Sequence, residues 1–345
     1  MRKISFVNLI AVTFILVYVM SITPNPVSSA QRPYHLWICV PNNNLIKVVD
    51  TNTKSLIATV LLTLGNEPQK IAFSHDGRYA YITCGATHNI VVFDTNTWTE
   101  LTSIKVGISP NAIEVTPDDS YIYVCNVKSN NVSVIRTSDN SVVRSIMVGL
   151  QPAAIAISPN GAYVYVANGG DNTISVIRTS DNTVVDNINV GFYPSGVAIT
   201  PDGRYAYVSN AKDGTLSVIR LSDNRVVDII YVGEWPTGLS ITPDGRYVYV
   251  CNQDTNSICV VGTTDNTVIS TIGIPAKPLE ITITPRGNYA YVVTNKGCVE
   301  VVDISDNSLL TTIDLGLATL TTSNLAIQPQ VAIEAKGPVE VCIRT

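Results

Sequence analysis

Short runs of alternating apolar and polar residues, separated by turn residues, make up most of the chain, and the segment Phe192–Gly233 shows them most clearly. Four of its runs have the length and alternation of β-strands: 196–200, 205–209, 216–219 and 226–232. The sequence Pro-Asp-Gly-Arg between the first two is a turn signal, because proline presets φ and glycine accepts a positive φ. No run has the apolar spacing of a helix. The segment therefore predicts four antiparallel strands.

This four-strand pattern recurs along the chain with a period of 42 residues. Each copy opens on a proline, at Pro68, Pro110, Pro152, Pro194, Pro236 and Pro278. A tyrosine pair follows in the second strand, as at Tyr205 and Tyr207. A repeat of this length is one supersecondary unit that buries its apolar face only by stacking on its neighbours. Four strands repeated about every forty residues predict the blades of a β-propeller.

The blade count follows from the two ends of the repeat array. Six full copies cover residues 66–317, and residues 35–65 and 318–329 supply the strands of one more blade. We expect these two fragments to pair, because closing the ring removes free strand edges. The expected fold is all-β: a seven-bladed β-propeller over 31–329, with four-stranded antiparallel blades, closed by three N-terminal strands and one C-terminal strand. Residues 330–345 form a separate C-terminal tail.

Residues 1–30 have the composition of a secretory signal peptide. Two basic residues precede an apolar run from Phe6 to Met20, and the small residues Ser28-Ser29-Ala30 follow. The apolar run is short for a bilayer span of about 20 residues, so we expect cleavage after Ala30. The mature chain shows no second apolar run of that length. The expected location is extracytoplasmic, in a periplasm, on a cell surface or in an equivalent compartment.

Charge and cysteine usage narrow the function classes. Charged residues make up 14% of the chain and the net charge is −5, which excludes the basic surface of a nucleic-acid-binding protein. Three of the seven cysteines, Cys39, Cys125 and Cys251, share a repeat position that other copies fill with Ala, Ser, Thr or Val. We expect small buried side chains there, not disulfides. We expect no metal or cofactor, since the Asp-Gly turns lack calcium-loop spacing and the three histidines are scattered.

A recurring motif ends the second strand, and it reads YVCN at Tyr123, YVAN at Tyr165, YVSN at Tyr207 and YVCN at Tyr249. With the preceding turns TPDGRY and SPNGAY, it resembles the YVTN family of β-propeller repeats, which occur in secreted bacterial proteins and archaeal surface-layer proteins. The resemblance extends from about His35 to Ile327 and implies the propeller fold. It brings no catalytic motif to this chain.

Candidate binding residues lie where the copies differ. The strand order predicts that the connections between blades and the loops after the second strands surround one mouth of the axial channel. Variable positions on a rigid scaffold are where function is expected. The candidates for partner binding are Glu67, His88, Phe192, Tyr193, Glu234, Trp235 and Lys277. The three aromatic residues suit an interface, or they only cover the packing between blades.

At the opposite end of the ring, one repeat position carries charges of both signs. Three successive blades have Arg136, Arg178 and Arg220 there, and the other side of the ring has Asp50, Asp94 and Asp303. Each arginine can pair with an aspartate three residues later, which is the expected arrangement. The alternative is a polarised surface that steers a charged partner.

Three functions stay open. The leading one is a secreted, non-catalytic module that binds a protein or serves as a scaffold, with no catalytic residue of its own. The second is the propeller subunit of a larger extracytoplasmic redox complex, such as hydrazine synthase, whose partner chains hold the cofactors. The third is a lactonase-like hydrolase, a class that gathers His, Arg and Glu at the channel mouth. The charges expected there in this chain are Glu67, Glu114, Glu234, Glu280 and Lys277.

Overall fold

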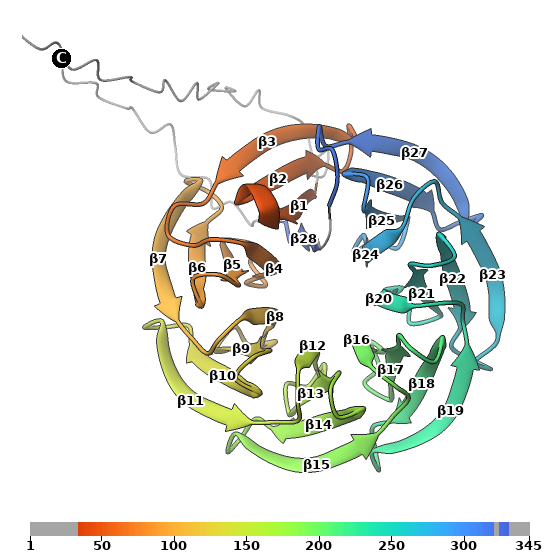
Figure 1. The fold of residues 1–345 in the computed structure, drawn as a ribbon, viewed down its shortest axis with the longest axis horizontal. Coiled ribbons are helices and arrows are strands. Elements are labelled where there is room, and N and C mark those ends of the chain that lie inside the picture. Colours follow the sequence, from red (N-terminus) through yellow and green to blue (C-terminus); the bar gives the residue numbers. More distant parts are fainter. Residues whose placement is uncertain (1–33, 321–323, 331–345) are drawn as a thin grey trace, which may run out of the picture. The chain divides into compact units, whose positions relative to one another are not determined.

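Seven four-stranded antiparallel sheets surround a central axis in the computed structural model, which describes residues 34–320 and 324–330 (Figure 1). The expected signal peptide and nearly all of the expected tail lie outside the described residues. Within the described part of the chain, no helix is long and apolar enough to cross a membrane. The seven four-stranded sheets confirm the predicted fold class.

Six blades follow one another along the chain and share one strand order. Blade 1 contains β4 (Pro68–Phe73), β5 (Tyr79–Cys84), β6 (Asn89–Asp94) and β7 (Thr99–Lys105). Blade 2 contains β8 (Pro110–Val115), β9 (Tyr121–Asn126), β10 (Asn131–Arg136) and β11 (Ser141–Met147). Blade 3 contains β12 (Pro152–Ile157), β13 (Tyr163–Asn168), β14 (Thr173–Arg178) and β15 (Thr183–Asn189).

The second half of the ring repeats this order. Blade 4 contains β16 (Pro194–Ile199), β17 (Tyr205–Asn210), β18 (Thr215–Arg220) and β19 (Arg225–Tyr231). Blade 5 contains β20 (Pro236–Ile241), β21 (Tyr247–Asn252), β22 (Ser257–Gly262) and β23 (Val268–Gly273). Blade 6 contains β24 (Pro278–Ile283), β25 (Tyr289–Thr294), β26 (Cys298–Asp303) and β27 (Ser308–Asp314). The first strand of each blade lies nearest the axis (Figure 1).

The closing blade joins the two ends of the described chain. It contains β1 (His35–Val40), the short 3₁₀ helix η1 (Pro41–Asn43), β2 (Leu45–Asp50), β3 (Ser55–Leu61) and β28 (Leu325–Gln328). Its sheet order is β28-β1-β2-β3, as the sequence predicts. Trp37 Nε1 donates to Gln328 Oε1 at 3.0 Å, and Gln328 Nε2 donates to the Gly77 carbonyl of blade 1 at 2.9 Å. The last strand is thus bonded both to the first strand and to the next blade.

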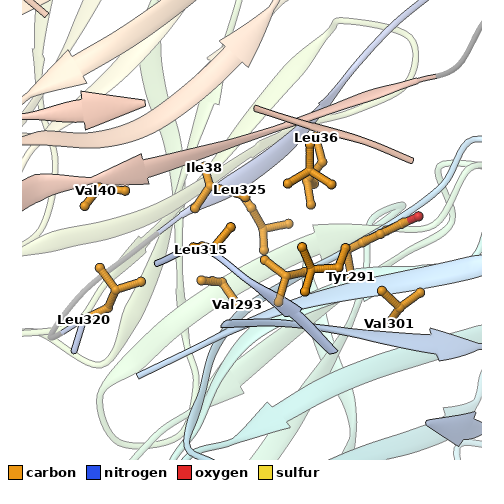
Figure 2. Packing of buried hydrophobic residues seen from close by; sticks show 12 residues of the cluster. Leu36, Ile38, Val40, Tyr291, Val293, Val301, Leu315, Leu320 and Leu325 are labelled. Atoms are coloured by element: carbon orange, nitrogen blue, oxygen red, sulfur yellow. The ribbon is translucent and has the colours of Figure 1, made fainter. Parts of the chain in front are cut away.

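Apolar side chains fill the contact between the closing blade and blade 6 (Figure 2). Leu36 and Ile38 of β1 and Leu325 of β28 meet Tyr291 and Val301 from β25 and β26. All five are buried, so the joint between the two chain ends has the same kind of core as the joints between successive blades.

The second tyrosine of each pair ties neighbouring blades together. Tyr207 is fully buried, and its hydroxyl donates to Asn266 Oδ1 of the next blade at 2.8 Å. The same bridge forms from Tyr123 to Asn182, from Tyr165 to Asn224 and from Tyr249 to Asn307. The second ring of these pairs thus packs inside the blade interface while its hydroxyl bonds the next blade. The three cysteines at the shared repeat position are buried as well, as expected of small core side chains.

Candidate functional site at the channel mouth

Backbone hydrogen bonds place the connections between blades beside the loops that follow the second strands. The amide of Ala211 donates to the Tyr193 carbonyl at 3.0 Å, and that of Gln253 donates to the Trp235 carbonyl at 3.1 Å. Gly85 bonds to the Glu67 carbonyl at 2.9 Å in the same way. These segments therefore surround one end of the channel, called here the mouth end, and the Asp-Gly turns form the turn end.

The residue before the proline of blades 1 to 5 has a left-handed backbone, although none of the five is glycine. The φ values are 60° at Glu67, 59° at Ser109, 53° at Gln151, 58° at Tyr193 and 54° at Trp235. This conformation costs an L-residue about 1–3 kcal/mol, so the surroundings must impose it. Here the preceding loop does so, because it bonds the amides of the connection.

Side chains of the second-strand loop hold that connection in place. Asn172 Oδ1 accepts the Tyr193 amide at 2.9 Å, and Asp213 Oδ2 accepts the Phe192 amide at 2.6 Å. With their backbones fixed on both sides, Phe192 and Tyr193 are presented at the mouth at little further cost in conformational entropy.

Aromatic rings from two adjacent connections meet at the mouth. The ring centroids of Tyr193 and Trp235 lie 6.3 Å apart, and Lys212 Nζ lies 5.3 Å from the Tyr193 centroid. Phe192 is 60% exposed and Trp235 is 38% exposed. The structure thus brings together the rings of Tyr193 and Trp235, two of the three aromatic residues that the sequence selects, and leaves large parts of Phe192 and Trp235 in solvent.

Two residues that the sequence reasoning did not select extend this surface. Ile108 and Leu150 occupy the repeat position of Phe192 and are 49% and 50% exposed. We call Ile108, Leu150, Phe192, Tyr193 and Trp235 the rim patch. The missed signal is visible in the sequence, since large apolar side chains stand at this position in three successive copies where the other copies have Asn66, Glu234 and Ala276.

The remaining mouth candidates have different surroundings. Glu67 and Glu234 are exposed, and Lys277 Nζ forms an ion pair with Asp254 Oδ1 at 2.8 Å. His88 is only partly exposed: its Nδ1 lies 2.8 Å from the Gly85 carbonyl oxygen and 3.3 Å from the Ser109 amide. His88 thus takes the place of the loop asparagines that bond the connections of other blades, which gives it a structural role.

Charged residues that the sequence placed at the mouth lie inside the channel instead. Glu114 and Glu280 belong to the innermost strands β8 and β24. Lys70 Nζ of β4 lies 3.6 Å from Glu280 Oε2, and Asn324 Nδ2 donates to the same oxygen at 3.0 Å. Gly238 makes room for this carboxylate, since a Cβ there would lie 2.7 Å from Glu280 Oε1.

The Glu114 side chain is exposed to the channel space, and the first strands of the other blades surround it at the sides. Desolvation by this surrounding protein raises the pKa of Glu114 to about 7, while the positive charges of Lys70 and His75 act in the opposite direction. Among the described residues, Glu114 forms no hydrogen bond or ion pair. It is therefore a channel carboxyl that no described protein group pairs.

At the turn end, the arginines pair locally, as expected. Arg136 Nη2 lies 2.7 Å from Asp139 Oδ2, and Arg220 Nη2 lies 2.6 Å from Asp223 Oδ2. Arg178 pairs with Asp181 and holds the pKa of that carboxyl down to about 2, mainly through the side-chain hydrogen bond. The acidic counterparts Asp50, Asp94 and Asp303 accept amides of their own turns. These surface pairs contribute little to stability.

No set of three or more His, Cys, Asp or Glu residues within 34–320 and 324–330 is placed to hold a metal ion. The charged groups in the channel are a lysine, two carboxyls and the edge residue His75, whose Nδ1 lies 2.8 Å from Asp119 Oδ1. A hydrolytic centre of the expected kind would need an arginine at the mouth, and the nine arginines between Arg78 and Arg286 lie on turn-end loops, at turn-end strand ends or on outer strands.

The class of protein follows from these features and from comparison with known families. The family model "Lactonase, 7-bladed beta-propeller" matches residues 44–146, 147–225 and 186–271, so the chain belongs to this family of seven-bladed propellers. A model of the LVIVD repeat matches residues 282–314. The YVTN resemblance is thus supported at the level of a propeller repeat. No curated protein matches the chain.

Solved structures share the fold at low sequence identity. A chain of Kuenenia stuttgartiensis hydrazine synthase is 24% identical with a TM-score of 0.67, over 72% of this chain and 86% of that chain. A functionally unknown protein from Desulfotomaculum acetoxidans DSM 771 is 16% identical with a TM-score of 0.75, over 86% of this chain and 99% of that chain. At such identities the similarity concerns the fold alone.

Proposed function

We propose that the chain is a secreted, non-catalytic propeller module that binds a protein partner through the rim patch. The observation that carries this proposal is that large apolar side chains stand exposed on backbone that is held rigid at a conformational cost. Phe192 is 60% exposed, and Tyr193 beside it has a φ of 58°. This backbone recurs in other blades, and glycine or asparagine suits it best, so the aromatic side chains of Tyr193 and Trp235 on it support a role other than stability.

The chemistry of the rim patch suits a protein interface. Aromatic side chains near the centre of an interface contribute most of its binding energy. Trp235 and Phe192 supply such anchors, and Tyr193 adds a ring with a polar hydroxyl. Glu67, Glu234 and the Lys277–Asp254 pair surround them as a polar border. A partner would meet an apolar centre with charged edges.

An extracytoplasmic location fits residues 1–30, whose pattern is that of a signal peptide. In that setting the partner is a cell-surface or periplasmic protein. Alternatively it is a cofactor-bearing chain of a larger redox assembly, and visible absorbance distinguishes these two cases.

The test measures the native mass of the protein purified from its source, for the parent chain and for Trp235→Gly. Glycine accepts the left-handed backbone and removes the ring. We expect the parent to run as a complex and Trp235→Gly as the single chain. A coloured complex would identify the redox assembly. A complex unaffected by Trp235→Gly would contradict the rim patch as its interface.

Trp98→Gly is the matched control for this test. Trp98 lies at the turn end, is 39% exposed and has a φ of 59°, so it resembles Trp235 in residue type, exposure and backbone. Its ring stacks on Trp37 at a centroid distance of 5.4 Å. We expect Trp98→Gly to lose some stability and to keep the complex.

A lactonase-like hydrolase is the second candidate, and membership of the lactonase-type family favours it. The groups available to it are Glu280, Lys70 and Glu114 in the channel. Hydrolysis of a panel of simple lactones, abolished by Glu280→Gln, would establish this alternative. Equal rates in the parent and in Glu280→Gln would dismiss it.

A further inference from the structure

The outer edge of blade 4 carries an apolar surface that the repeat does not require. Ile229 and Tyr231 of β19 are 64% and 65% exposed. At the repeat position of Ile229 the other blades all have a polar residue: Thr59, Ser103, Ser145, Asn187, Thr271 and Thr312. At the position of Tyr231, blade 3 has Asn189. Because the same blade forms with polar residues at these positions, the fold does not explain the two apolar side chains, and exposed apolar surface of this kind marks interaction sites.

This surface lies beside the connection between blades 3 and 4, which carries two residues of the rim patch. Ser217 is the cross-strand partner of Ile229, so both side chains lie on one face of the blade. The Gly191 amide donates to Ser217 Oγ at 3.4 Å, so the connection crosses that face. Tyr231 reaches the loop that holds the connection, because a Cβ at Gly214 would lie 3.0 Å from Tyr231 Cε2. The rim patch therefore continues onto the outer edge of blade 4.

The backbone of this edge is already partly bonded. β19 is the outermost strand of its sheet, and such an edge can accept a further strand. The Val232 amide bonds inward to the Gly214 carbonyl at 2.9 Å, so by alternation the Ile229 amide faces outward. Asp228 Oδ1 accepts that amide at 2.9 Å, and Asp228 Oδ2 accepts Asn266 Nδ2 at 3.0 Å, which holds the carboxylate in place. A partner therefore meets this surface best through side chains, from an element whose own backbone bonds are complete.

We propose that the partner of the rim patch lays an amphipathic α-helix along the outer edge of blade 4, with the apolar side of the helix on Ile229, Tyr231 and Phe192. This inference rests on the proposed function, because it extends the same interface. The main-chain hydrogen bonds of a helix lie within the helix, so it needs no donor from β19. Ile229 and Tyr231 lie about 7 Å apart along the strand, close to the rise of about 5.4 Å per helical turn. Side chains from successive turns of the apolar stripe can therefore cover both.

Photo-crosslinking in the native host tests this mode of contact. A photoreactive phenylalanine is placed at Ile229 in one variant and at Tyr231 in another. We expect both variants to capture the same partner protein, and neither to capture it once Trp235→Gly is added. Mass spectrometry of the adducts then locates the captured residues of the partner. Neighbours on one side of a helix are three or four residues apart, so we expect that spacing between the residues captured from the two positions.

A double variant, Ile229→Asn with Tyr231→Asn, measures what the two side chains contribute. It should keep the fold, because blade 3 has Asn187 and Asn189 at these positions. We expect the complex purified from the source to dissociate at protein concentrations at least about tenfold higher than the complex of the parent chain. Met147→Asn is the matched control, since Met147 stands at the position of Tyr231 in blade 2 and is 66% exposed. We expect this control to leave the dissociation unchanged.

The possible outcomes separate this inference from the proposed function. The helix is overturned if neither position captures the partner, if the captured residues lie two apart as in a strand, or if they belong to a second copy of this chain. It is also overturned if the double variant dissociates like the parent while Trp235→Gly abolishes the complex, and in that case the proposed function stands. A complex that survives both changes overturns the proposed function and the helix together.

Discussion

The two ends of the ring share one repeat but use it differently. At the turn end, Thr200 Oγ1 donates to Asp202 Oδ1 at 2.6 Å, and the same bond joins Ser74 to Asp76, Thr116 to Asp118, Ser158 to Asn160 and Thr242 to Asp244. Both ends also repeat a left-handed backbone position, but at the turn end it mostly carries asparagine, as at Asn140 and Asn182, whereas at the mouth end its side chain changes from Glu67 to Ser109 to Trp235.

This difference separates the groups that stabilise the fold from those left for binding. At the turn end, side chains satisfy one another and the same partners recur from blade to blade. At the mouth end, loop side chains such as Asn172 and Asp213 bond the backbone, so Phe192, Tyr193 and Trp235 keep their rings for other contacts. A repeat can thus hold a varied surface without changing its own geometry.

The largest effect should come from opening the ring. Deletion of 317–345 removes β28, and with it the Gln328 bonds to Trp37 and Gly77. The exposed edge of β1 would then lack its partner. We expect the truncated chain to unfold or to oligomerise, as measured by circular dichroism and size-exclusion chromatography. An equally stable truncated monomer would refute the closure.

Removing a repeated tyrosine should cost far more than removing a rim aromatic. Tyr207→Ala deletes a buried ring and its bond to Asn266, and we expect the free energy of unfolding to fall by about 3–5 kcal/mol. Phe192→Ala should change it by less than about 0.5 kcal/mol. Urea denaturation of both variants makes the comparison. Equal losses would mean that the rim patch serves the fold.

Backbone strain at the mouth should make a variant with glycine at a strained position more stable than the variant with alanine at the same position. Trp235 has a φ of 54°, which glycine accepts and alanine resists. We expect Trp235→Gly to be more stable than Trp235→Ala by about 1 kcal/mol in thermal unfolding. The reverse order would show that the connection relaxes when the ring is lost.

The smallest effect should be a pH-dependent one in the channel. Because the folded pKa of Glu114 is raised to about 7, ionisation weakens the fold as pH rises from about 4.5 to about 7. Channel water reduces this penalty, so Glu114→Gln should be more stable than the parent by at most about 1 kcal/mol at about pH 8. The two chains should be equally stable at about pH 4. A constant difference at all pH values would rule out ionisation as the cause.

The sequence predicted the repeated part of the molecule well. Pro194, the turn at 201–204 and the tyrosine pair mark strand ends directly, and the observed strands of blade 4 differ from the predicted ones by one or two residues at most ends. The turn-end pairs followed from a spacing of three residues. Each of these signals is local, so a single copy of the repeat contains it.

The channel could not be predicted in this way, because its groups come from distant strands. Lys70, Glu280 and Asn324 meet only when β4, β24 and β28 become neighbours around the axis. The sequence did contain a signal for Lys70 and Glu280, because both stand at a first-strand repeat position where the other copies have alanine or glycine. The left-handed backbone of Tyr193 was hidden too, since its cause is the side chain of Asn172 in the loop of the preceding blade.

Site-specific photo-crosslinking in the native host tests the central claim most directly. A photoreactive phenylalanine is placed at Phe192, in the rim patch, or at Tyr163, which is 37% exposed at the turn end. We expect one discrete protein adduct from position 192, lost when Trp235→Gly is added, and none from position 163. The account is contradicted if both positions give the same adducts, or if position 192 captures no protein.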